Sequence, residues 1–146
     1  MKSLLIIVLI PFCSFTSLAQ MITHSTLQYE IRNTNDKGIE TKKIIPYKSY
    51  LFYSGFYEGA KDNTMILDLY KANNEAETLL FQLLSKETDK EKKTTTFYAR
   101  LVDCEKNSIF YSNNETIVML FNNKSLAIGF LNCELYLRNY TSTIEY

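Results

Sequence analysis

The chain has few residues able to do acid–base or nucleophilic chemistry. His24 is its only histidine, and one imidazole can act as a general acid or base near neutral pH. No Gly-x-Ser-x-Gly, His-Glu-x-x-His or Cys–His signature accompanies it. We therefore expect His24 to be an ordinary structural or exposed histidine, and we predict no catalytic residue.

Carboxylates offer a second possible chemistry. Two that face each other across a cleft could hydrolyse a glycoside-like bond. Four lie in or beside expected strands, namely Glu30, Asp68, Asp103 and Glu134. Nothing in the sequence brings any two of them together, so exposed positions on strand faces are the favoured interpretation. A carboxylate-dependent hydrolase is therefore only the third functional hypothesis.

The cysteines indicate a structural role. Cys13 lies in the leader described below, which leaves Cys104 and Cys133 as an even pair. Neither belongs to a Cys-x-x-Cys motif, and no cluster of histidine and cysteine suggests a zinc site. In an oxidising compartment such a pair forms a disulfide. We predict a Cys104–Cys133 disulfide between neighbouring strands, no metal site and, since no nucleotide-binding glycine motif is present, no cofactor.

The densest functional signal is aromatic. Six aromatic residues fall between Tyr47 and Tyr57. Tyrosine combines a large apolar area with a hydrogen-bonding hydroxyl, which suits a ligand pocket or a protein contact. We predict recognition by Tyr50, Tyr53 and Tyr57, and we expect Phe52 and Phe56 to anchor the segment in the core. The competing interpretation is that the whole segment is core.

The N-terminus predicts export. Lys2 precedes an apolar run from Leu4 to Ile10, and Ser17-Leu18-Ala19 closes the segment with small residues at the cleavage positions. This is the layout of a secretory signal peptide, and the run is too short to span a bilayer. We predict that residues 1–19 are a signal peptide cleaved after Ala19, and that residues 20–146 form a single exported domain, secreted or periplasmic.

Charge and hydropathy exclude some partners. The chain carries 16 basic and 16 acidic residues, and loss of Lys2 with the leader gives a net charge of −1. Such a balance does not attract nucleic acid or an anionic membrane. No later apolar run reaches spanning length. We expect a soluble product without a membrane span, whose partner is a small molecule or a protein.

Sequons at Asn114, Asn123 and Asn139 would be glycosylated only in a eukaryotic secretory pathway.

The elements that position these residues are mostly strands. Apolar runs alternate with polar residues and are separated by Asn-rich turns. The Thr116–Phe121 run is continuously apolar, which predicts a strand covered on both sides. The expected strands are Leu27–Arg32, Ile39–Ile45, Tyr50–Tyr53, Thr64–Tyr70, Thr94–Cys104, Ser108–Tyr111, Thr116–Phe121, Ser125–Leu131 and Cys133–Tyr140.

Residues 75–85 fit two structures. Ala76, Leu79, Leu80, Leu83 and Leu84 follow a helical spacing, and the local composition favours a helix. The same residues could instead form a strand that pairs with the segment after the charged turn. The helix is the preferred interpretation.

Together these patterns predict a mainly antiparallel β domain. Its strands would form a small meander barrel, lipocalin-like, or a β-sandwich, with one possible helix near residues 75–85. The leading functional hypothesis is an exported binding domain for a small apolar or amphipathic molecule. The second is a protein-interaction module of the inhibitor or immunity type. An aromatic cavity would favour the first, and an aromatic surface patch the second.

Overall fold

The computed structural model describes residues 21–61, 63–111 and 115–145. The expected leader and Asn114 lie outside these ranges. Eleven strands follow one another along the chain: β1 (Met21–Thr26), β2 (Tyr29–Thr34), β3 (Glu40–Ile45), β4 (Ser49–Tyr53), β5 (Thr64–Tyr70), β6 (Ala76–Asp89), β7 (Thr94–Asp103), β8 (Ile117–Asn122), β9 (Ser125–Gly129), β10 (Glu134–Arg138) and β11 (Thr141–Glu145). Within these ranges no helix has the length and apolar content that a membrane span requires.

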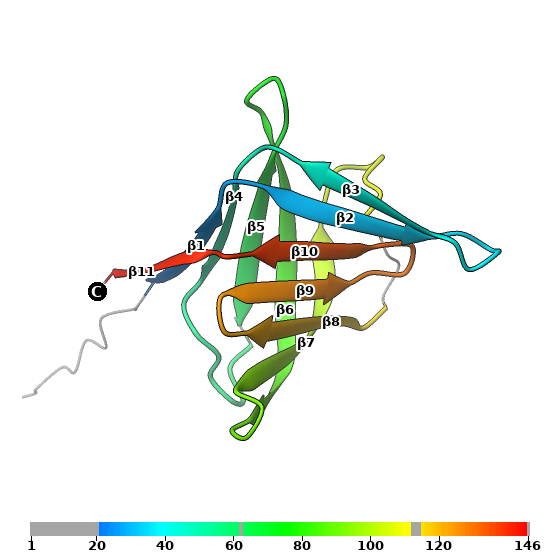
Figure 1. Cartoon of the computed structure of the whole chain (residues 1–146). Coiled ribbons are helices and arrows are strands. Elements are labelled where there is room, and N and C mark those ends of the chain that lie inside the picture. Colours follow the sequence, from blue (N-terminus) through cyan, green and yellow to red (C-terminus); the bar gives the residue numbers. More distant parts are fainter. Residues whose placement is uncertain (1–20, 62, 112–114, 146) are drawn as a thin grey trace, which may run out of the picture.

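All eleven strands belong to one antiparallel sheet, which confirms the predicted fold class. Their order is β11-β1-β4-β5-β6-β7-β8-β9-β10-β2-β3. The sheet is open, with β11 and β3 as its edges, so it is neither a closed barrel nor two separate sheets. Figure 1 shows that it curls strongly: β4, β5 and β6 run behind β8, β9 and β10 and are steeply inclined to them.

Two bent stretches of chain join the far ends of this sheet. β1 continues into β2 after only Leu27 and Gln28, although the two strands lie at opposite ends of the order. β10 continues into β11 in the same way. The β1–β2 segment and the β10–β11 segment therefore pair along their length as one bent, two-stranded ribbon. Met21 lies opposite Glu145 and Arg32 lies opposite Glu134, so the pairing keeps the same register before and after the bend. The ribbon therefore holds the two walls of the curled sheet around a single interior.

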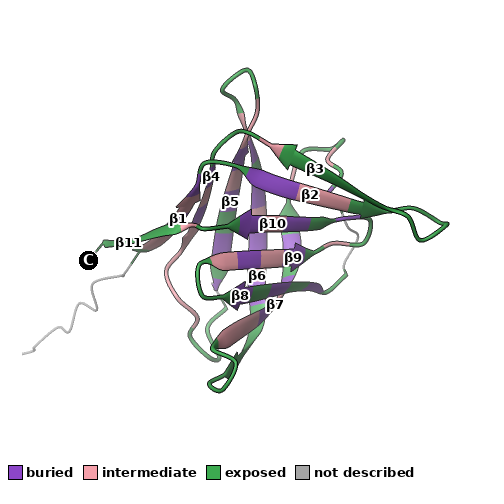
Figure 2. Cartoon of the chain, viewed as in Figure 1, coloured by how far each residue is buried: buried purple, intermediate pink, exposed green. Residues whose placement is uncertain are grey.

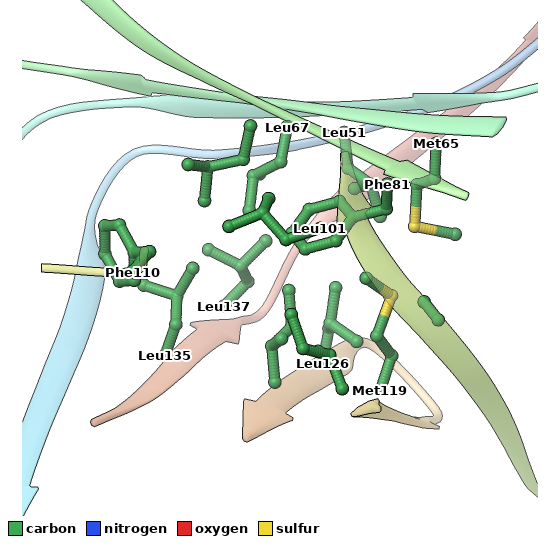
Figure 3. Packing of buried hydrophobic residues seen from close by; sticks show 14 of the residues in the cluster. Leu51, Met65, Leu67, Phe81, Leu101, Phe110, Met119, Leu126, Leu135 and Leu137 are labelled. Carbon is green, nitrogen blue, oxygen red and sulfur yellow. The ribbon is translucent and has the colours of Figure 1, made fainter. Parts of the chain in front are cut away.

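Side chains fill most of that interior. Alternate residues of each strand point inward, as the two-residue repeat of a strand requires, and Figure 2 shows the resulting buried stripes. In Figure 3, Leu51, Met65 and Leu67 of one wall face Met119, Leu126 and Leu137 of the other. Apolar burial of this kind is the main stabilising term of the fold, at about 25 cal/mol for each Å² removed from water.

One end of the interior is closed by a segment that was predicted to be a strand. Residues 108–111 form turns instead, in which Ser108 N donates to Glu105 O and Tyr111 N donates to Ser108 O. The turns place Phe110, which is 2% exposed, against Phe130 at 4.8 Å between ring centroids. Phe110 thus covers this end of the interior together with Phe130.

The preferred helix at residues 75–85 is wrong. Ala76–Asp89 is a strand paired with β5 on one side and β7 on the other, with irregular register near Leu80 and Leu83. Leu79, Phe81 and Leu83 point inward, whereas Leu84 is exposed. Two neighbouring strands offer hydrogen bonds along the whole segment, and this tertiary context overrides helix propensity. The alternative interpretation, a strand that pairs with the segment after the charged turn, is confirmed by the antiparallel pairing of β6 with β7.

Two further expectations need correction. β8 alternates between buried and exposed residues, so Val118 and Leu120 lie on an open face instead of being covered on both sides. Cys104 and Cys133 are both free thiols. Cys104 follows β7 and Cys133 precedes β10. Because β8 and β9 lie between β7 and β10 in the sheet, the two cysteines do not belong to neighbouring strands, as the disulfide prediction assumed.

Candidate functional site

The end of the curled sheet opposite Phe110 is hollow. An open pocket of about 330 Å³ lies there, which is within the range of small-molecule sites. We call it the mouth pocket. Its lining residues are Ile22, His24, Tyr53, Gly55, Phe56, Lys86, Lys93, Thr95, Phe97, Phe121, Asn123 and Tyr140.

Strand alternation explains why β1 contributes to this pocket. In the sequence Met-Ile-Thr-His-Ser-Thr, every second residue starting from Ile22 points to the same face. His24 is 8% exposed and Thr26 is 5% exposed, so a polar edge of β1 is turned inward. Thr26 does not line the pocket; its Oγ1 lies 2.7 Å from Ser49 Oγ of β4, and this hydrogen bond gives each of the two buried hydroxyls a partner.

His24 is enclosed by rings. Its ring centroid lies 4.4 Å from that of Tyr140, 5.7 Å from that of Tyr53 and 5.9 Å from that of Phe121. Its Nδ1 is 2.7 Å from Ser142 Oγ on β11. Burial lowers the pKa of His24 below its usual 6.5, so the imidazole is neutral at pH 7. A neutral imidazole is compatible with an apolar floor.

The rest of the floor is aromatic. Phe97 packs edge-on against Phe121 at 5.6 Å and against Tyr53 and Phe56 at 6.2 Å between centroids. Burial raises the pKa of both Tyr53 and Tyr140, and the Tyr140 hydroxyl adds to the shift of Tyr53. Both phenols therefore stay protonated at neutral pH and keep an O–H that can donate a hydrogen bond.

The rim is basic. Lys86 on β6 and Lys93 in the β6–β7 turn line the pocket and are exposed. The Lys86 ammonium lies 5.8 Å from the centre of the Phe97 ring. No aspartate or glutamate lines the pocket, and within the described ranges neither lysine forms an ion pair. The mouth pocket thus combines an apolar floor with a cationic edge.

The β4–β5 loop overhangs one side of the pocket, where it contributes Gly55 and Phe56. Asn63 holds this loop: its Oδ1 accepts from Tyr57 N at 3.0 Å, and its Nδ2 donates to Tyr57 O at 2.8 Å and to Ala60 O at 3.2 Å. A second hollow of about 390 Å³ lies beyond Phe56 and shares both Phe56 and Lys86 with the mouth pocket. Phe56 therefore borders both hollows, and Asn63 anchors the loop backbone at Tyr57 and Ala60.

The three tyrosines predicted to recognise a ligand do not meet at one site. Tyr53 lines the mouth pocket. Tyr50 lies on the outer face of β4, where it contacts Phe52 at 6.1 Å and Tyr70 at 5.8 Å between centroids. Tyr57 is 60% exposed in the loop. Phe52 lies outside the core, because it shares the outer face with Tyr50, whereas Phe56 packs against the core as expected.

The carboxylates considered for hydrolysis are engaged elsewhere. Glu30 on β2 is ion-paired with Arg32, with Lys42 at 3.5 Å and with Arg138 at 3.6 Å. Partial desolvation opposes ionisation of Glu30, but these cations hold its pKa below the usual value. Asp68, on the distant strand β5, accepts from Thr78 Oγ1 at 2.6 Å. Glu134 on β10 accepts from Tyr136 Oη. Glu30, Asp68 and Glu134 thus belong to an ion-pair cluster and two separate hydrogen bonds, not to a facing acid pair.

Sequence reasoning missed the most central residue of the pocket, His24. The signal that could have found it is the alternation of Ile22, His24 and Thr26, which predicts an inward face. Among the described residues, no group of three or more histidine, cysteine, aspartate or glutamate side chains could hold a metal ion. In comparison with known proteins, the chain matches no family model, no curated protein and no solved structure.

Proposed function

We propose that this chain is an exported binding protein whose mouth pocket takes a small amphipathic molecule. The observation that carries the proposal is the position of the pocket: it is an open hollow lined by aromatic rings in an interior that is otherwise filled. A pocket of this size with a few polar groups around an apolar floor is the usual form of a small-molecule site. The expected leader, residues 1–19, supports export of the domain.

A neutral aromatic dye tests this proposal. N-phenyl-1-naphthylamine fluoresces when it enters an apolar site, and it can be excited at wavelengths that neither tyrosine nor tryptophan absorbs. We expect saturable, one-to-one binding. Thr95 lines the pocket, and Thr96 is the next residue on β7, so its side chain lies on the opposite face. Thr95→Trp should fill the hollow and abolish binding, while Thr96→Trp should leave it unchanged.

The paired tryptophan variants make the outcome specific. Equal loss of binding in both would mean that the dye reports a general change in the fold. Retention of binding by Thr95→Trp would place the dye outside the mouth pocket and contradict the proposal. Melting temperatures of both variants establish that each still folds.

A second function, that of a protein-interaction module, is favoured by a separate observation. The outer face of β4 and β5 carries Tyr50, Phe52, Tyr70 and the exposed Ile66. Lys48 lies over the rings of Tyr50 and Tyr70 at 5.7 and 5.2 Å. If this patch is the functional surface, Tyr50→Ser with Phe52→Ser should abolish binding of a partner protein that Thr95→Trp still binds.

A further inference from the structure

The charges around the mouth pocket bear on the kind of molecule it takes. Lys86 and Lys93 stand at its edge without an ion-pair partner in the described part of the chain. Of the acids of the same hairpin, Asp89 contacts Lys92 Nζ at 3.8 Å and accepts from two backbone amides, Glu87 accepts from Tyr98 Oη at 3.5 Å, and neither these two nor Glu91 lines the mouth pocket. Lys86 and Lys93 are therefore the charged side chains of the lining, although Glu58 shares the neighbouring hollow with Lys86.

The floor restricts where negative charge can sit. His24, Phe97 and Phe121 leave no ionised group in the depth of the pocket, and burying an unpaired charge there would be costly. A molecule charged at both ends would lose hydration without gaining a partner at the floor. A molecule with one charged end would place its apolar part among the rings and its charge at the edge.

We propose that the ligand of the mouth pocket is an organic anion with an apolar body, whose acidic head group lies between Lys86 and Lys93. This inference rests on the proposed function and adds the charge and orientation of the ligand. The lining also offers neutral hydrogen-bond donors for an anionic oxygen, namely the hydroxyls of Tyr53, Tyr140 and Thr95 and the side-chain amide of Asn123. A cationic amphiphile is disfavoured by the same two lysines.

Two dyes that share one ring system test the inference. 8-Anilinonaphthalene-1-sulfonate is N-phenyl-1-naphthylamine with an added sulfonate, so the pair differs by one negative charge. At low ionic strength we expect the sulfonate to bind more tightly than the neutral dye. Lys86→Met together with Lys93→Gln should weaken sulfonate binding about tenfold, the effect of two exposed ion pairs, and should weaken neutral-dye binding clearly less, so that the ratio of the two affinities falls.

A matched variant separates a local contact from the general field. Lys90→Gln with Lys92→Gln removes two charges from the same turn, and neither residue lines the pocket. We expect this variant to bind both dyes as the parent does. Equal affinity for the two dyes in the parent, or an equal effect of both lysine pairs, would overturn the inference while the neutral dye still supports the proposed function. If Thr95→Trp fails to remove either dye, the proposed function fails as well.

Discussion

At the scale of single residues, His24 is a buried side chain in the lining of the mouth pocket. It is the only histidine in the chain, so its imidazole signals in a proton NMR spectrum need no assignment by mutation. Burial among Tyr53, Phe121 and Tyr140 disfavours the charged ring. We predict that the imidazole titrates below pH 6.5, and a value at or above 6.5 would contradict the burial.

The same shift predicts how stability depends on pH. The pKa of His24 is lower in the folded protein than in the unfolded chain, so the unfolded chain binds the proton more readily. The contribution of His24 is therefore fully present above about pH 6.5, the unfolded value, and is lost as pH falls toward the lower folded value. The fall in the urea midpoint between pH 7 and pH 5.5 should be smaller in His24→Asn than in the parent.

The two cysteines give a second prediction at this scale. Burial, with a smaller effect of Glu134, raises the pKa of Cys133 to about 11, and Cys133 is 5% exposed. Burial also raises the pKa of the more accessible Cys104. In the chain from Gln20, iodoacetamide at pH 8 should therefore label Cys104 first and Cys133 only on unfolding, as peptide mass mapping would detect. If neither cysteine is labelled until a reductant is added, the two free thiols are contradicted and the Cys104–Cys133 disulfide predicted from the sequence is supported.

At the scale of elements, the β4–β5 loop depends on one buried amide. Asn63 is 5% exposed and makes three hydrogen bonds to the loop backbone. Asn63→Ala removes all three bonds and leaves Tyr57 N and Ala60 O without their side-chain partner, whereas Tyr57 O still accepts from Ala60 N. The substitution should lower the free energy of unfolding by about 1–3 kcal/mol. Asn73→Ala, which removes an exposed turn contact, is the matched control and should cost less. Equal urea midpoints for the two variants would contradict this role of Asn63.

The elements also show where sequence patterns suffice. Thr94–Cys104 alternates clearly, and its predicted strand is confirmed because one face is core and the other is solvent. Residues 76–89 mislead because leucines at 79, 80, 83 and 84 satisfy a helical repeat, whereas the strand buries only two of them. β1 was missed because a histidine inside a short N-terminal segment does not look like a core position. Only the pairing with β4 and β11 turns it inward.

The candidate site was the hardest feature to predict. Tyr53 was chosen from the aromatic segment and does line the pocket, but Tyr50 differs from it only by strand phase and so faces the other way. Apart from the segment around Tyr53, the lining residues come from β1, β6, β7, β8, the β6–β7 and β8–β9 turns and the β10–β11 connection. No local pattern joins them, since the curl of the sheet alone brings these strand ends together.

At the scale of the whole molecule, the signal-peptide prediction specifies the first residue of the exported protein. β1 starts at Met21, and the predicted cleavage leaves Gln20 as the first residue. When the full chain is expressed in a secreting host, we predict that the intact mass of the exported protein corresponds to residues 20–146, with or without cyclisation of Gln20. Retention of residues 2–19 in the exported protein would contradict the signal-peptide interpretation.

The arrangement of the described residues places the mouth pocket at one end of the interior. Phe110 and Phe130 close one end of the interior, and the ribbon of β1–β2 with β10–β11 holds the walls together. The other end stays open beneath the β4–β5 loop and the β6–β7 turn. A ligand can therefore enter without separating any strand pair.

The most direct test of the mouth pocket as the binding site is the His24 imidazole signal during titration with N-phenyl-1-naphthylamine. Because His24 lies on the pocket floor, the aromatic dye should shift this signal with the same dissociation constant that fluorescence gives. In Thr95→Trp the dye should no longer shift it. Saturable dye binding that leaves the His24 signal unmoved in the parent protein would contradict the proposal.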